Sequence, residues 1–239
     1  MTQTPRRLFD IPAPPDLPVA GDDRVFPVRR IFCVGRNYAA HAAEMGNTVD
    51  RDAPFYFTKS AHALCLSGST VAYPPGTSDC HHEMELVVAL GASAFAVDTG
   101  GAMAAVWGYA CGIDLTRRDL QAAAKDKRRP WDTGKDFENA AIVGALTPAG
   151  AFGAPGAQAI TLDLDGRRVQ NARLSEMVWS VPEIVADLSR LYHLQPGDLI
   201  FTGTPAGVGP VQPGSRLRGE ITGLAPVELE IGPSEQPPG

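Results

Sequence analysis

The chain has 239 residues, of which 44% are hydrophobic and 20% charged, a composition that excludes a disordered protein and fits one large or two small domains. Its formal net charge of −6 and the lack of an uninterrupted basic stretch argue against a nucleic-acid partner. The 25 glycines and 21 prolines predict many turns and short strands rather than a helical bundle.

The first 30 residues are rich in proline and predict an extended arm (1–30) over a folded domain at residues 31–239. This N-terminal stretch has no apolar core of a signal peptide, and the longest uncharged stretch is broken by glycine and proline. The four cysteines are scattered and form no CxxC pair, which disfavours a structural zinc site. We therefore expect a cytoplasmic protein with reduced thiols and no membrane partner.

Seven short apolar runs predict strands, at residues 30–34, 54–58, 83–90, 107–113, 161–164, 198–202 and 227–231. The last run alternates apolar and acidic residues, as a strand with one buried face does. Asp165 and Gly166, directly after the fifth run, predict a hairpin turn.

Three segments predict helices, at residues 37–46, 116–127 and 180–191. Asn37 is the expected N-cap of the first helix and Gly46 its end. Asp119 stands where the second helix would have the acid of a capping box, and Ser180 and Glu183 form a stronger box for the third. Many strands, few helices and no regular alternation predict an α+β or mainly β domain rather than a Rossmann fold.

Acidic residues mark two of the predicted strands. Glu83 and Glu85 begin an otherwise apolar run and share one face of a strand, and Asp114 ends another apolar run. Buried neighbouring carboxylates repel one another, and a divalent cation relieves that repulsion. Three carboxylates without a soft ligand suit Mg²⁺ or Mn²⁺. A solvated face at a strand end is the alternative for the two glutamates.

Two histidines precede the glutamates. Because neighbouring residues of a strand face opposite sides, His81 and His82 cannot both join the carboxylates. At least one of them is expected to serve packing or to support the site indirectly.

A second histidine–acid pair lies on the first predicted helix. His41 and Glu44 are three residues apart and therefore on one face. A carboxylate that orients an imidazole makes a general base that works near neutral pH, although a surface pair would show the same spacing.

Other segments carry groups that suit an anionic substrate. The Arg36 guanidinium suits a carboxylate, and Lys135, in WDTGKDF, suits an oxyanion or a structural ion pair. The run TGTPAGVGP at residues 202–210 can bind an anion through backbone N–H groups and hydroxyls, or form an ordinary turn.

Six segments in this order resemble the fumarylacetoacetate hydrolase superfamily, above all its fumarylpyruvate and acylpyruvate hydrolase branch: IFCVGRNYAAHAAEMG, PFYFTKS, HHEMELVVALG, GYACGIDLTRRDLQ, PWDTGKDF and QPGDLIFTGTPAGVGPV. The similarity runs from residue 31 to residue 231. It implies a mixed β-sandwich or β-roll with a few peripheral helices, usually a homodimer, that binds Mg²⁺ or Mn²⁺.

The resemblance also implies roles for single residues. The metal ligands would be Glu83, Glu85 and Asp114, and the catalytic residues His41, Glu44 and Lys135. The substrate contacts would be Arg36, Tyr38, Lys59, Arg118, Gln121, Gly203 and Thr204.

We therefore expect an enzyme that cleaves the C3–C4 bond of a 2,4-diketo acid, with His41 activating water and Lys135 stabilising the oxyanion at C4. Fumarylpyruvate is the favoured substrate, because Arg36, Arg117 and Arg118 are candidate partners for a second carboxylate. The alternatives are oxaloacetate decarboxylation, isomerisation of an unsaturated dicarboxylic acid, and a non-catalytic metal-binding protein.

Overall fold

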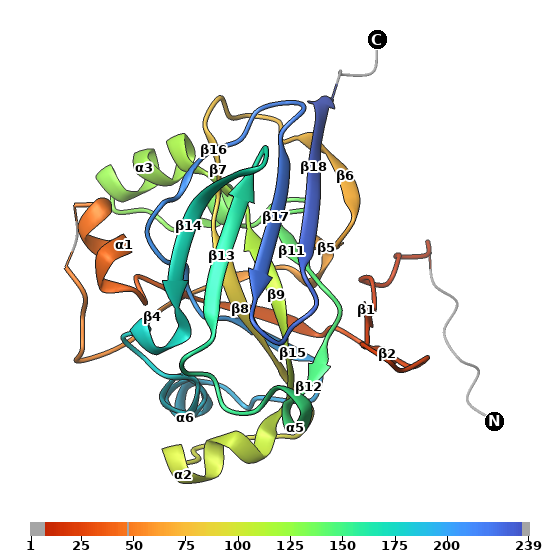
Figure 1. Cartoon of the computed structure of the whole chain (residues 1–239), viewed down its shortest axis with the longest axis vertical. Helices are drawn as coiled ribbons and strands as arrows, with labels where there is room; N and C mark the ends of the chain where they lie inside the picture. Colours follow the sequence, from red (N-terminus) through yellow and green to blue (C-terminus); the bar gives the residue numbers. More distant parts are fainter. Residues whose placement is uncertain (1–7, 47, 236–239) are drawn as a thin grey trace.

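The computed structural model describes residues 8–46 and 48–235 of the chain. Two sheets pack face to face, and in Figure 1 the smaller one lies in front of the larger. The larger sheet has the strand order β4 (Phe55–Lys59), β3 (Arg30–Gly35), β15 (Asp198–Phe201), β8 (Met84–Leu90), β9 (Val106–Asp114), β11 (Ala141–Val143) and β5 (Leu64–Leu66), with β12 (Thr147–Pro148) also beside β9. The smaller sheet has the order β14 (Arg167–Arg173), β13 (Ala159–Leu164), β17 (Arg216–Ile221), β18 (Val227–Ser234) and β6 (Ser69–Tyr73).

Smaller elements surround these sheets. A three-stranded ribbon pairs β10 (Thr116–Arg117), β7 (Cys80–His82) and β16 (Gly209–Pro210), and a two-stranded one pairs β1 (Leu17–Pro18) with β2 (Val25–Phe26). The helices are α1 (Ala39–Glu44), α2 (Thr99–Ala102), α3 (Arg118–Asp126), α4 (Asp132–Lys135), α5 (Ala149–Phe152) and α6 (Val181–Leu191). Three 3-10 turns add Ala61–Ala63, Met103–Ala105 and Leu174–Glu176. Helices α2, α5 and α6 gather at one end of the sheets and α3 at the other (Figure 1).

The position of strand β8 in the centre of the larger sheet explains why its sequence is almost continuously apolar. All seven of its residues are buried, with Met84, Leu86 and Val88 in the core between the sheets and Val87 on the opposite face. That second face is covered by the N-terminal segment, whose Leu17 is fully buried there. A strand covered on both faces has no solvent side, so it lacks the polar alternation of a half-exposed strand. Glu85 is therefore a carboxylate inside a core strand.

The mainly β fold with few helices is as predicted, and all seven predicted strands are present. The strands that the sequence pattern missed, above all β14 and β17, carry charged residues on an exposed face, which weakens the apolar signal. Strand β3 begins at Arg30, where the predicted arm ends, and the division of the chain at residue 30 stays a prediction. No helix among the described residues is long and apolar enough to cross a membrane.

The three predicted helices form, but two of their predicted caps are wrong. The N-cap of α1 is Tyr38, and the Asn37 amide instead bonds the backbone of Trp179 and Thr202. Helix α3 begins at Arg118 without a side-chain cap, because Asp119 is engaged by Thr77 and Ser78. Distant tertiary partners have displaced local capping in both cases. The Ser180–Glu183 box of α6 is confirmed.

Candidate active site

The three predicted acids meet at one end of β8 and β9. Glu83, Glu85 and Asp114 are each buried, and each offers an oxygen within 4.8 Å of the others. Asp114 ends β9, and its backbone N–H donates to the Glu83 carbonyl, which ties the two strand ends together. The solvated-face alternative for the glutamates is therefore excluded.

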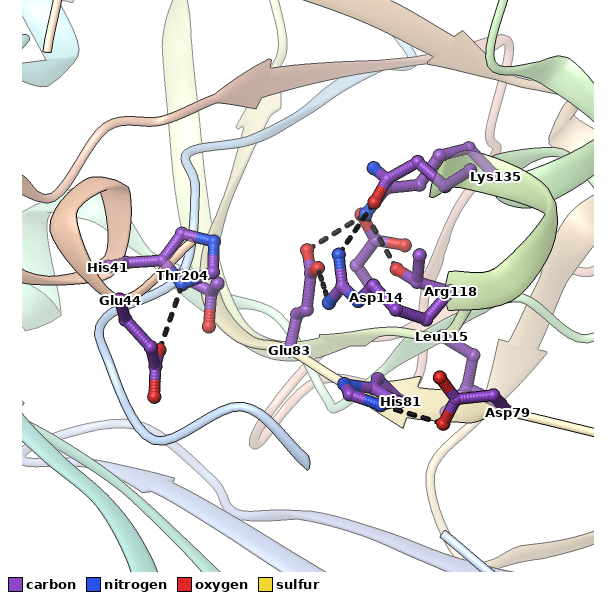
Figure 2. A network of polar contacts seen from close by, with 12 residues as sticks. His41, Glu44, Asp79, His81, Glu83, Asp114, Leu115, Arg118, Lys135 and Thr204 are labelled. Carbon is purple, nitrogen blue, oxygen red and sulfur yellow. Dashed lines mark hydrogen bonds and ion pairs between the residues drawn. The ribbon is translucent and has the colours of Figure 1, made fainter. Parts of the chain in front are cut away.

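Three buried cations balance these acids. The Lys135 ammonium donates to Glu83 and Asp114, each at 2.8 Å, and to the Thr116 hydroxyl at 2.7 Å (Figure 2). Arg118 pairs with Glu83 at 2.5 Å, and Lys59 with Asp114 at 2.9 Å. All three protons of Lys135 are thus engaged.

The two glutamates differ in electrostatic environment. Burial alone would raise the pKa of Glu83, but the charges of Lys135 and Arg118 outweigh it and hold the pKa well below its usual value. Burial, Asp114 and Glu83 raise the pKa of Glu85 well above its usual value. Its carboxylate accepts a hydrogen bond from the Gly203 N–H at 2.6 Å. Glu85 is therefore the carboxylate with the least compensated negative charge.

A cavity lined by Glu83 and Glu85 is also lined by His41, the histidine of the predicted His41–Glu44 pair. His41, on α1, has its Nδ1 atom 3.4 Å from a Glu44 carboxylate oxygen (Figure 2). If Nδ1 carries the proton toward Glu44, Nε2 of the neutral ring is left as a proton acceptor. Burial lowers the pKa of His41 despite the opposing effects of Glu83 and Glu44. The imidazole is thus held in the form a general base requires.

Two backbone N–H groups of the run at residues 202–210 donate to carboxylates of the protein itself, and binding of a substrate anion by this run stays a prediction. The Gly203 N–H donates to Glu85, and the Gly207 N–H lies 3.1 Å from both oxygens of Glu44. Both glycines have positive φ, and a Cβ atom on Gly207 would lie 2.0 Å from the Val169 carbonyl. The loop therefore connects the metal-ligand candidates with the dyad.

The remaining predicted contacts divide into two groups. Arg36, Arg118, Gln121, Lys135 and Thr204 line the cavity together with His41, Glu83 and Glu85. Gln121 accepts a hydrogen bond from Arg118 at 2.7 Å.

Lys59, Tyr38 and Arg117 do not line it. Lys59 is enclosed by Asp114 and the carbonyls of Leu115 and Lys135. The Tyr38 hydroxyl is buried without a hydrogen-bond partner among the described residues. Arg117 stacks on Phe137 instead.

Neither predicted histidine neighbour belongs to the carboxylate cluster. His81 bonds Asp79 at 2.9 Å (Figure 2), and His82 is almost completely buried. Burial lowers the pKa of His82 to about 4, which keeps its imidazole neutral near pH 7.

The sequence pattern missed Lys125 and Trp131, which also line the cavity. The Lys125 ammonium lies 4.8 Å from the centre of the Trp131 ring. Burial, Arg118 and Arg36 lower the pKa of Lys125 to about 8. Spacing could have signalled Lys125, which is one helical turn after Gln121 on α3.

The cavity is small, with a volume of about 30 Å³. A larger groove of about 350 Å³ adjoins it, and Phe57, Trp131 and Lys135 line both. A ligand larger than the cavity has to extend into this groove or displace α1 or the Trp131 side chain.

The family model for the fumarylacetoacetate (FAA) hydrolase C-terminal domain matches residues 30–231. The chain belongs to the fumarylacetoacetate hydrolase family. It is 50% identical over 194 residues to a fumarylpyruvate hydrolase from a Ralstonia species, a match that covers 80% of this chain and 100% of that protein.

Solved structures and other relatives agree with this family. The crystal structure of fumarylpyruvate hydrolase from Pseudomonas aeruginosa in complex with Mn²⁺ and pyruvate superposes with a TM-score of 0.92 at 46% identity, covering 96% of this chain and 100% of that one. A mitochondrial oxaloacetate tautomerase from Arabidopsis thaliana is 37% identical, covering 84% of this chain and 90% of that protein.

Proposed function

We propose that this protein is a metal-dependent hydrolase that cleaves fumarylpyruvate to fumarate and pyruvate. The observation that carries the proposal is a cluster of three buried carboxylates, two of which line one cavity together with His41 of the histidine–glutamate pair. The relatives that match over almost their whole length support the choice of substrate. A metal-binding protein without activity needs no oriented general base, so the dyad argues against that alternative.

The residues present fit a divalent metal ion. Glu83, Glu85 and Asp114 offer hard oxygen ligands, and burial together with the charges of Asp114 and Glu83 raises the pKa of Glu85, a penalty on its ionised form that a bound cation would relieve. A Mg²⁺ or Mn²⁺ ion bound there would act as a Lewis acid that stabilises negative charge on the departing pyruvate half.

The protein side chains supply the proton transfers. Nε2 of His41 accepts a proton from the water that adds to C4, while Glu44 holds the ring through Nδ1. Lys135 stabilises the resulting oxyanion by its charge, and its bond to the neutral Thr116 hydroxyl is the weakest of its three and the one a substrate oxygen can replace. The C3–C4 bond then breaks, and its electron pair passes to the pyruvate half, which is protonated at C3.

The charge of the site fits a substrate with two carboxylates. The buried acids Glu83, Glu85 and Asp114 are balanced by Lys59, Lys135 and Arg118. A divalent ion would therefore leave a net positive charge, to which Arg36 and Lys125 of the cavity lining add, and this favours a dianionic substrate such as fumarylpyruvate.

Arg36 and Lys125 are the best placed partners for the distal carboxylate. Both line the cavity, and neither forms an ion pair with another described residue. Arg118 is less available, because Glu83 and Gln121 already bind it. This arrangement favours a fumaryl group over an acetyl group.

The test is a parallel assay of fumarylpyruvate, acetylpyruvate and oxaloacetate with Mg²⁺ or Mn²⁺. We expect stoichiometric fumarate and pyruvate from the first substrate, with the highest kcat/KM of the three. Oxaloacetate is included because tautomerase and decarboxylase relatives share about 37% identity. A protein that turned over only oxaloacetate would refute the proposal.

The oligomeric state and the location in the cell are also proposals. We expect a homodimer, which the family resemblance supports and light scattering after size exclusion would check. We expect a reducing, cytoplasmic location, which is supported by four free and buried cysteines.

A further inference from the structure

The amide of Gln170 is a buried polar group in an otherwise solvent-facing strand. Gln170 is 0% exposed and is the one fully buried residue of β14, the edge strand of the smaller sheet. Burial of an amide is unfavourable unless its hydrogen bonds are all made. The sequence pattern gave no reason to single this residue out.

Three hydrogen bonds connect this amide to the candidate active site. Its Oε1 atom accepts from the Met84 N–H at 3.0 Å, between Glu83 and Glu85. Its Nε2 atom donates to the Thr204 hydroxyl oxygen at 2.9 Å and to the Pro205 carbonyl at 2.8 Å.

The two backbone partners fix the orientation of the amide. Only the oxygen of Gln170 can accept from the Met84 N–H, and only its nitrogen can donate to the Pro205 carbonyl. The Thr204 hydroxyl must therefore accept a hydrogen bond from Gln170. Its own proton is engaged by no described residue, and Thr204 lines the cavity.

We propose that Gln170 is a positioning residue that makes Thr204 a hydrogen-bond donor to the carboxylate of the substrate's pyruvate half. The inference rests on the proposed function. The pyruvate half belongs at this position because Thr204 follows Gly203, whose N–H holds the candidate metal ligand Glu85.

The test measures the affinity of pyruvate for the Mn²⁺-loaded protein by calorimetry. Thr204→Val removes the donor and should weaken pyruvate binding about ten- to hundred-fold, whereas Thr204→Ser keeps the hydroxyl and should restore most of it. Gln170→Glu places a carboxylate oxygen, which is an acceptor, where the Gln170 nitrogen now donates to the Thr204 hydroxyl. The Thr204 proton would then bond the carboxylate at position 170 instead of pyruvate, so pyruvate binding should weaken to a similar extent. Gln170→Met removes the orientation without adding charge and should have a smaller effect.

The decisive comparison is the double variant. If Gln170 acts through Thr204, either substitution of Gln170 should weaken pyruvate binding less than about threefold in the Thr204→Val background. Multiplicative losses would overturn the inference, as would wild-type affinity in Gln170→Glu or in Thr204→Val. Asn171→Met, at the next and exposed position of β14, is the matched control and should bind pyruvate normally.

Folding and the proposed function are checked separately. Circular dichroism and thermal melting check that each variant is folded. If neither Gln170 variant folds, equal pyruvate affinities of Thr204→Val and Thr204→Ser still overturn the inference. Failure of the wild-type protein to cleave fumarylpyruvate or bind pyruvate would refute the proposed function itself. Wild-type turnover with unaffected Gln170 variants would refute only the role of Gln170.

Discussion

His41 is the residue whose protonation state should set the lower pH limit of activity. Because burial lowers its pKa below the ordinary value of 6.5, the imidazole is neutral and able to accept a proton at pH 7. At saturating Mn²⁺, kcat/KM should fall only as the pH drops below 6.5. Glu44 opposes the effect of burial, so Glu44→Gln should move this acidic limb to still lower pH while it slows turnover. A limb that moved to higher pH would contradict the dyad.

Lys125 should determine preference for the second carboxylate. Lys125→Met removes a cation beside Arg36 and should raise KM for fumarylpyruvate about tenfold or more, with little change for acetylpyruvate. Lys127→Met, an exposed position just after α3, is the control and should leave both unchanged. Equal effects of Lys125→Met on the two substrates would count against a distal carboxylate site.

Residue types and spacings predict the reactive residues of the site better than they predict the residues that hold them in position. Glu83 and Glu85 are found by strand periodicity, and His41 and Glu44 by helical spacing, because both patterns are local. Gln170 acts on Met84, 86 residues earlier in the chain, and no local pattern reveals such a contact.

At the scale of elements, α1 is the part of the site that we expect to open. It has only six residues, too few to be stable as an isolated helix. Residues on both sides of it are attached near the start of α6: Asn37 bonds the Trp179 backbone, and Arg51, seven residues after the helix, stacks on the Trp179 ring and pairs with Glu183 of α6 at 3.3 Å. The helix can thus move while both flanking residues stay attached.

Hydrogen exchange should detect this movement. Without ligand, backbone amides at residues 41–46 should exchange faster than those of β8, and Mn²⁺ with pyruvate should slow them. The expected reason is that a movement of α1 would enlarge the small cavity for a diketo acid. Exchange as slow as in β8, with or without ligand, would exclude a gating role.

Helices and strands with a local sequence signal are predictable from the sequence, whereas the residues at which they begin and end are less predictable. Strand β8 is recognisable as an unbroken apolar run, and α6 by its capping box. Asn37 was assigned to a local cap because its partners, Trp179 and Thr202, lie far away in the sequence. Strand β14 has no strong apolar pattern, because its one fully buried residue is the polar Gln170 and only Val169 and Ala172 pack against the core as partly buried apolar residues.

For the whole molecule, metal binding and folding should be separable. A chain of this length buries enough surface to fold without a metal ion. Mn²⁺ at 100 times its Kd should nevertheless stabilise the wild-type protein by about 2.7 kcal/mol, because only the folded chain brings the three acids together.

Glu85→Gln should abolish this stabilisation. The neutral amide can still accept from the Gly203 N–H, and it removes a buried charge that Asp114 and Glu83 repel, so the metal-free variant should melt no lower than the wild-type protein. Its Mn²⁺ affinity should fall by more than about 100-fold, since even loss of an outer support typically costs ~10–100-fold. A thermal shift with Mn²⁺ equal to that of the wild-type protein would remove Glu85 from the ligand set.

The central claim is that water activated by His41 attacks C4 of fumarylpyruvate. Turnover in H₂¹⁸O, stopped while unreacted substrate is still unlabelled, tests it most directly by mass spectrometry of the products. The account predicts one ¹⁸O atom in the new carboxylate of fumarate and none in the pyruvate carboxylate, at a rate roughly 10²–10⁴-fold lower in His41→Ala. Fumarate without the label, or His41→Ala with the wild-type rate, would contradict it.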